Sequence, residues 1–175
     1  IEIAESVLEW IDNDVTPNSS GVEDDYYLGL KQPYRTSSTL MVDLSELLLI
    51  KGVTKQEFQR LRDHICVLPK SVPINLNTAS SVILQVMGVE LEKLVERREE
   101  KNEPFKDEKS ALEGQPPAVK NLLKKNRFSV SSQFYELSVA VNLDQKQAYL
   151  NTVIYRPDIN EKSATFQVIS RNRLA

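Results

Sequence analysis

The stretch YELSVAVNL, Tyr135–Leu143, places a large apolar side chain at every second position and a small or polar one between them. This alternation is typical of a half-buried β-strand, because successive side chains point to opposite faces of a sheet. Working outward, residues 144–147 (DQKQ) predict a turn, and further strands are expected at Ala148–Tyr155 and Thr165–Ser170. Three consecutive strands with short connections predict an antiparallel meander.

At the start of the chain, residues 1–12 predict one amphipathic helix. Its apolar residues recur at helical spacing, at Ile1, Ala4, Leu8 and Ile11. The Asn, Asp, Ser, Pro and Gly residues that follow favour turns and end the helix. One face of the predicted sheet needs a cover, and this helix is the expected one. Together these elements predict the α+β class.

Between these two parts, the pattern changes to short apolar helices separated by Gly and Pro. They are expected at residues 44–51, 54–68, 78–87, 90–101 and 118–125. Capping residues mark several of the starts, namely Asp43, Thr54 with Glu57 three residues on, and Asn77 or Thr78. We therefore expect a large helical domain, residues 36–126, inserted into an α+β domain made of residues 1–35 and 127–175.

Two segments of the helical part resemble each other. Each consists of a helix, a glycine turn and a second helix, with the sequences LLLIKGV at 47–53 and ILQVMGV at 83–89. Gly52 and Gly88 stand where the residue after a helix adopts a left-handed conformation, and the valine after each glycine can pack back on that helix. The repeat indicates helix-hairpin-helix-like units.

The amino-acid composition narrows the range of functions expected for the protein. Of 175 residues, 41% are hydrophobic and 27% are charged, and the formal net charge of −3 does not indicate a basic nucleic-acid-binding face. The single cysteine, Cys66, cannot form an internal disulfide and is expected in the core. The single histidine, His64, cannot build a multi-histidine metal site and is expected to be partly exposed. No stretch approaches the roughly 20 apolar residues that cross a bilayer.

For catalysis the sequence offers no recognisable motif. It contains neither a Gly-x-Ser-x-Gly elbow nor a glycine-rich phosphate loop. Charge runs such as residues 96–101 are typical of solvated helix faces. We therefore expect a protein that is not an enzyme.

Five carboxylates in two short runs around Gly21 form a candidate metal site. They are Asp12, Asp14, Glu23, Asp24 and Asp25. Hard oxygen ligands suit calcium, but the spacing is not that of an EF-hand, which needs alternating ligands and a closing glutamate. A calcium site and a capped, solvated acidic loop both fit this pattern.

Helix-hairpin-helix units can also bind nucleic acid, through the amides of the hairpin and nearby cations. Here the second hairpin reads MGVE (87–90), with a single glycine and with Glu90 where a phosphate would lie. Lysines and arginines near the two turns are interleaved with glutamates. A structural use of the motif is therefore favoured, and nucleic-acid binding is the alternative function.

Several stretches, taken in order, resemble the K-type minor pseudopilins of bacterial type II secretion systems, also called general secretion pathway protein K. They are WIDND (10–14), GVEDDYY (21–27), PYR (33–35), SELL (45–48) with Gly52, and NLNTA (75–79). The resemblance implies a pseudopilin fold, with a long N-terminal helix on a small antiparallel sheet and a large helical domain inserted between them. In Gram-negative bacteria such proteins normally carry a leader and a hydrophobic helix anchored in the inner membrane, so Ile1 is expected to mark a cut within that helix.

The resemblance also implies a function and partners. Members of this family are thought to cap the tip of the pseudopilus together with I-type and J-type minor pseudopilins, for protein export across the outer membrane. The helical domain would face the periplasm or the secretin, and secreted substrates are further candidate partners. The stripe of Ile1, Ala4, Leu8 and Ile11 is expected to dock partner helices. Family members bind calcium, a role that the resemblance extends to Asp12, Asp14, Glu23, Asp24 and Asp25.

Overall fold

The computed structural model describes residues 2–13, 24–101, 103–144, 146–157 and 165–174. The chain divides into two compact units, Ile1–Ser71 and Val72–Ala175. Helices occur in both units and the antiparallel sheet lies in the second, which agrees with the predicted mixture of helix and sheet. None of the described helices is long and apolar enough to cross a membrane.

The first unit is helical in its described part. Its elements are α1 (Glu2–Ile11), α2 (Asp24–Leu28), the 3₁₀ helix η1 (Leu44–Leu49) and α3 (Lys55–Leu61). The helix predicted at the N-terminus is confirmed over α1, whereas α2 lies where a loop was expected. The helix predicted over 54–68 ends early, at Leu61, before a run of residues with weak helix propensity.

Capping boxes start two of these helices, at the predicted capping residues Asp43 and Thr54. The Asp43 side chain accepts a hydrogen bond from the backbone N–H of Ser45, and the backbone N–H of Asp43 donates to Glu46 Oε1. At α3, Thr54 Oγ1 accepts from the Glu57 N–H, while the Thr54 N–H donates to Glu57 Oε2. These reciprocal bonds satisfy N–H groups that have no partner inside the helix.

The core of the first unit is one apolar cluster. Its buried members are Trp10, Tyr27, Leu47, Ile50 and Val53. They come from α1, α2, η1 and the turn after η1, so stretches distant in the sequence share a single core.

The second unit contains four helices among its described residues. They are α4 (Ser81–Val86), α5 (Leu91–Lys101), α6 (Glu108–Ala111) and α7 (Pro117–Lys124). Three of them match predicted helices, and α6 was missed because four residues are too short to show a helical period. Their buried core includes Leu76, Leu84, Leu94, Leu112 and Phe128.

Asn77 does not cap α4, contrary to the prediction. Ser80 is the N-cap, and its side chain accepts a hydrogen bond from the Ile83 N–H. The Asn77 amide instead donates to the carbonyls of Phe105 and Val130 and accepts from the Phe105 N–H. Asn77 therefore joins three segments, beside a short parallel pair formed by β1 (Ile74–Asn75) and β2 (Phe128–Ser129).

Both predicted left-handed glycines are confirmed. Gly52 has a φ of 84° and Gly88 a φ of 77°. After α4, the Gly88 N–H donates to the Gln85 carbonyl and the Val89 N–H donates to the Leu84 carbonyl, the paired bonds of a Schellman motif. Val89 is buried against the core, as expected.

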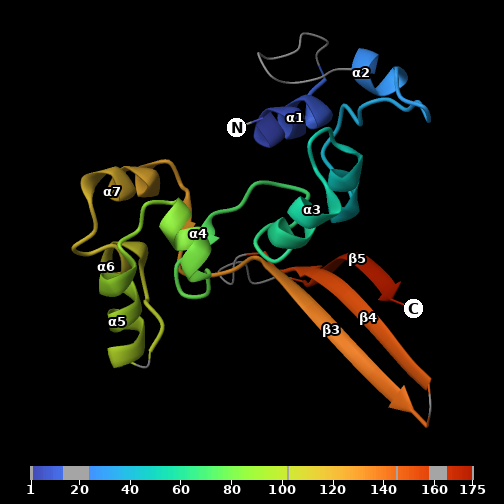
Figure 1. Ribbon diagram of the computed structural model, residues 1–175. Helices are drawn as coiled ribbons and strands as arrows, with labels where there is room; N and C mark the ends of the chain where they lie inside the picture. Colours follow the sequence, from blue (N-terminus) through green and yellow to red (C-terminus); the bar gives the residue numbers. More distant parts are fainter. Residues whose placement is uncertain (1, 14–23, 102, 145, 158–164, 175) are drawn as a thin grey trace. The chain divides into compact units, whose positions relative to one another are not determined.

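The predicted meander is also confirmed. β3 (Phe134–Leu143), β4 (Lys146–Tyr155) and β5 (Gln167–Leu174) form an antiparallel sheet in that order (Figure 1). The register places Leu143 opposite Lys146 and Phe134 opposite Tyr155, with an irregularity at Val153/Ile154.

The prediction that the first strand is half-buried is wrong. Alternate residues of β3 from Tyr135 to Leu143 form an apolar stripe, and these side chains are between 37% and 70% exposed. The buried cluster of the second unit is built from residues of 76–128, and no described residue of β3–β5 belongs to it. Alternation thus fixes which side chains share a face but not whether that face is covered. The predicted cover by the N-terminal helix, and the boundaries 1–35 with 127–175 and 36–126, stay predictions.

Candidate partner-binding helix and acidic loop

Helix α1 is held in the first unit by one apolar face. Ile3, Val7 and Ile11 are partly buried and pack on the cluster that contains Trp10. Close packing is visible at Gly52, where a Cβ would lie 3.5 Å from Ile3 Cγ1. This face is therefore occupied by the unit itself.

A second side of α1 is also buried, although its residues are polar. Ser6 and Glu9 are fully buried. Sequence reasoning missed this, because the acidic residues Glu2, Glu5, Glu9 and Asp12 have the spacing of a solvated helix face. Burial on both sides leaves a narrow strip of α1 exposed.

Because of this burial, only some residues of the predicted docking stripe are exposed. Ala4 and Leu8 are exposed, and 54% of Leu8 is accessible to solvent. Ile11 is half-buried in the core of the unit, and Ile1 lies outside the described residues. Among the described residues of this stripe, Leu8 is therefore the large apolar side chain that a partner can reach.

Aromatic residues from the stretches that resemble the K-type family pack together around Trp10 of α1. The ring of Trp10 packs edge-on against Tyr27 and Tyr34, with centroid separations of 5.5 and 6.2 Å. Trp10 Nε1 donates to Glu46 Oε2 at 3.4 Å, and the Tyr34 hydroxyl donates to the Leu49 carbonyl at 2.7 Å. The described parts of these stretches, residues 10–13, 24–27, 33–35 and 45–48, thus form one structural unit that positions the helix.

Asp24 is engaged within the protein. Its carboxylate forms an ion pair with Arg35 and accepts hydrogen bonds from the Thr36 N–H at 2.9 Å and the Thr36 hydroxyl at 3.0 Å. The backbone N–H of Thr36 is the main group that holds the pKa of Asp24 below its ordinary value of 3.8. The Thr36 hydroxyl and Arg35 lower this pKa further, while desolvation opposes them. Asp24 therefore fastens α2 to residues 35–36.

The other predicted calcium ligands are dispersed or lie outside the described residues. Asp12 is half-buried, and its Oδ1 is buried without a hydrogen-bond donor among the described residues. Asp25 is exposed, and Asp14 and Glu23 lie outside the described part of the chain. Within the described residues, no three His, Cys, Asp or Glu side chains gather in a way that could hold a metal ion.

His64 and Cys66 lie on the surface of the protein. Both are exposed and follow α3. The prediction that Cys66 lies in the core is wrong, because α3 ends at Leu61 and the segment after it lies on the surface.

The hairpin after α4 uses its polar groups within the protein. The Glu90 N–H donates to Gln115 Oε1 at 2.7 Å, and Gln115 Nε2 donates to the Glu90 carbonyl at 2.9 Å. The Glu90 carboxylate pairs with Lys93. The Glu90 amide and the Lys93 ammonium group at this hairpin are therefore already engaged, and the nucleic-acid alternative is not supported.

Comparison with known proteins agrees with the stretches gathered around Trp10. Residues 1–70 match the family model described as type II secretion system (T2SS), protein K, and this range coincides with the first unit. The resemblance to type II secretion system protein K is confirmed. Type II secretion system protein K of Pectobacterium carotovorum subsp. carotovorum is 40% identical over 78 residues, which are 44% of this chain and 24% of that protein.

A second relative extends the similarity over both units. Type II secretion system protein K of Aeromonas hydrophila is 25% identical over 173 residues, which are 92% of this chain. The chain spans 52% of the length of that relative and a smaller share of the first.

A solved structure shares the fold. It is described as the GspK-GspI-GspJ complex from the type 2 secretion system of enterotoxigenic Escherichia coli. The match has a TM-score of 0.78 and 24% identity, and it covers 99% of this chain and 63% of that chain. The mixture of helices with a small antiparallel sheet is therefore the fold of a known protein K structure.

Proposed function

We propose that this chain is part of a non-enzymatic K-type minor pseudopilin, which caps the tip of the type II secretion pseudopilus together with I-type and J-type minor pseudopilins. Its role is protein export across the outer membrane of a Gram-negative bacterium. The observation that carries the proposal is the match of residues 1–70 to the protein K family over a unit that folds around α1. The partners follow from the solved protein K structure, which contains GspI and GspJ.

The geometry of α1 supports the docking part of this proposal. Ala4 and Leu8 remain exposed on a helix whose apolar face packs in the unit. Apolar surface buried by a partner contributes roughly 25 cal/mol per Å² before the cost of association. The proposed contact is therefore a partner helix lying along Ala4 and Leu8, with Ile1 and Ile11 at its ends.

A bulky helical domain explains why such a subunit would end a filament. Pilus subunits add by packing like surfaces against one another, so a domain that covers the growing end blocks the next subunit. We place residues 36–126, with their helix-hairpin-helix-like units, in this role within a pseudopilin fold. The domain would face the periplasm, where the secretin or secreted substrates could contact it, and the protein would be held at the inner membrane.

The test is assembly of the complex in solution. The chain is mixed with the soluble parts of the I-type and J-type minor pseudopilins from the same organism, and the molar mass is measured by light scattering. A one-to-one-to-one complex is expected. Failure to associate, with all three proteins folded, would overturn the proposal.

We further propose calcium as a structural ligand of the acidic loop, held by Asp12, Asp14, Glu23, Asp24 and Asp25. The buried Oδ1 of Asp12, which has no donor among the described residues, supports this. Asp24 fits less well, because Arg35 and Thr36 already use its carboxylate. Thermal unfolding in calcium and in chelator tests the site: calcium should raise the melting temperature of the parent but not of Asp12→Asn. Equal melting temperatures for the parent in both buffers would contradict it.

A further inference from the structure

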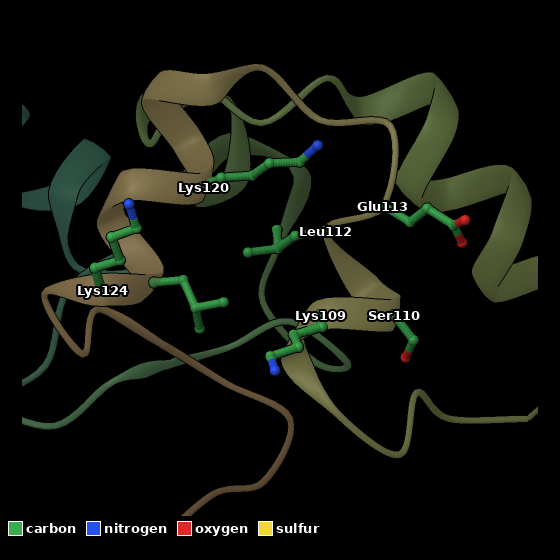
Figure 2. Close-up of a pocket in the computed structure, with 7 residues that line it drawn as sticks. Lys109, Ser110, Leu112, Glu113, Lys120 and Lys124 are labelled. Atoms are coloured by element: carbon green, nitrogen blue, oxygen red, sulfur yellow. The ribbon is translucent and has the colours of Figure 1, made fainter.

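A basic cavity lies between α6 and α7 in the second unit (Figure 2). Its volume is about 550 Å³. Lys109 reaches it from α6, and Lys120 and Lys124 reach it from α7. Because Lys120 and Lys124 are four residues apart on one helix, they lie on the same face. Three lysine side chains thus line one cavity.

Within the described part of the chain, none of Lys109, Lys120 and Lys124 forms an ion pair. The acidic residue at the cavity, Glu113, is paired with Arg97, with 3.2 Å between Oε2 and Nη2. The cavity therefore has an excess of positive charge.

The wall of the cavity is fixed in place by the same arginine. Arg97 donates hydrogen bonds to the Ser110 and Glu113 carbonyls, one on each side of Leu112. Its guanidinium also lies over the ring of Phe105, with 5.3 Å from Cζ to the centroid. A ligand would thus meet a largely preformed surface, which lowers the entropic cost of binding.

The floor between the lysines is apolar. Leu112 and Leu123 line the cavity, and both pack with the core of the second unit. Figure 2 shows the Leu112 side chain between Lys109 on α6 and Lys120 on α7. An apolar floor with lysine side chains beside it suits a ligand that offers an apolar side chain flanked by negative charges.

We propose that this cavity binds an acidic peptide segment of another protein, with one large apolar side chain on the leucine floor and carboxylates at the three lysines. Ammonium groups pair with carboxylates as point charges, and an apolar group is needed to fill the floor. A nucleic-acid backbone offers phosphates but no such apolar group. The hairpin amide that would bind a phosphate is moreover used by Gln115.

The test uses the whole chain and three short peptides in isothermal titration calorimetry. The first, acetyl-GEELEEG-amide, carries glutamates on both sides of one leucine. In the second, glutamines replace the glutamates, and in the third, serine replaces the leucine. We expect the first peptide to bind and each of the others to bind about fivefold more weakly or worse. Equal affinity for all three peptides, or no binding of the first, would overturn the proposal.

A matched pair of variants locates the site. Lys120→Gln with Lys124→Gln should weaken binding of the first peptide by about fivefold, because two partly desolvated charge contacts are lost. Lys55→Gln with Lys146→Gln removes the same charge from exposed lysines that do not line the cavity. This control should stay within about twofold of the parent. Equal losses in the two double variants would show general charge attraction and refute the site.

Experiments with inorganic phosphate and with duplex DNA distinguish these two ligands from the peptide. Inorganic phosphate should displace the peptide only at concentrations that act through ionic strength, and sodium chloride of equal ionic strength should do the same. Specific displacement by phosphate would indicate a simple anion site and overturn the peptide assignment. Tighter binding of duplex DNA than of the first peptide, lost in Lys120→Gln with Lys124→Gln, would assign the cavity to nucleic acid instead.

Discussion

The side-chain amide of Gln115 pairs with the backbone of Glu90 at both of its ends, in bonds of 2.7 and 2.9 Å. Gln115 follows the left-handed Gly114, and Glu90 precedes α5. This pair therefore ties the turn between α6 and α7 to the turn between α4 and α5. It is a long-range contact made by a residue that is only 3% exposed.

Replacing Gln115 by alanine should destabilise the second unit. Gln115→Ala removes both bonds and leaves a small void, so the free energy of unfolding should fall by about 2 kcal/mol. Urea denaturation followed by circular dichroism measures the change. The control, Gln59→Ala on the exposed part of α3, should change it by less than about 0.5 kcal/mol. Similar values for both variants would mean that the pair contributes little.

The backbone conformation of Gly88 predicts a second effect. Gly88→Ala should cost about 1–2 kcal/mol, because an alanine at a φ of 77° is strained. Side-chain packing does not add to this cost, since a Cβ there would meet Val119 Cγ2 at 3.8 Å. Gly29→Ala is the control, because Gly29 lacks a positive φ and its Cβ would make contacts of 3.4 Å. If the two substitutions cost the same, left-handed strain is not the cause.

The environment of Asp24 predicts an acid-sensitive contribution to stability. Hydrogen bonds from Thr36 and the charge of Arg35 hold its pKa below 3.8 in the folded state. The folded state therefore binds this proton less well than the unfolded state does. The contribution of the Asp24 carboxylate to stability is fully present at pH values above the ordinary pKa of 3.8, and it is lost as the pH falls through the lowered pKa. Asp24→Asn should show a smaller loss of stability between neutral pH and about pH 2 than the parent.

Denaturant titrations at a series of pH values test this expectation. Thr36→Val keeps the carboxylate and removes the hydroxyl donor, so its acid profile should lie between those of the parent and Asp24→Asn. An Asp24 carboxyl resonance that titrates above pH 3.8 in the folded chain would be incompatible with the hydrogen bonds described.

Leu8 predicts a loss of assembly without a loss of folding. Leu8→Asp should weaken the complex with the I-type and J-type proteins about tenfold or more, because a charge replaces an apolar anchor. The stability of the isolated chain should change little, since Leu8 is 54% exposed. Light scattering of the mixture measures the first effect and thermal unfolding the second.

Val86→Asp supplies the matched control. Val86 is 78% exposed on α4 and belongs to the second unit, so the same change of chemistry should leave assembly intact. An assembled Leu8→Asp complex would refute the docking face on α1. Loss of assembly in both variants would indicate a general response to surface charge.

The spacing of apolar residues in the sequence was sufficient to predict the long helices and strands. The alternation in Tyr135–Leu143 predicted β3, and the apolar spacing in residues 1–12 predicted α1, since both patterns run through several turns or pleats. Elements of two to five residues, such as β1, β2, α2 and α6, carry too few positions to show a period. The β1–β2 pair also joins segments far apart in the chain, which local patterns cannot reveal.

The candidate site was predictable only in outline. Leu8 was found by its place in an apolar stripe, but the burial of Ser6 and Glu9 depends on tertiary packing that helical spacing does not encode. Asn77 has the chemistry of a helix cap, yet its position among three segments gives it a bridging role. The cavity at Lys109, Lys120 and Lys124 was missed, because its two helices follow one another in sequence without any motif.

The connection between β3 and β4 limits how this protein can be altered. Leu143 faces Lys146, so only residues 144 and 145 separate the strands, and Asp144 has a φ of 52°. Because side chains alternate strictly, one inserted residue that shifts the pairing by a single position would turn one strand's apolar side chains to the opposite face, whereas a shift by two would preserve the pattern. Natural length variation and engineered tags at this tip should therefore be tolerated where they extend the loop outward, and should be harmful where they cause a one-residue slip.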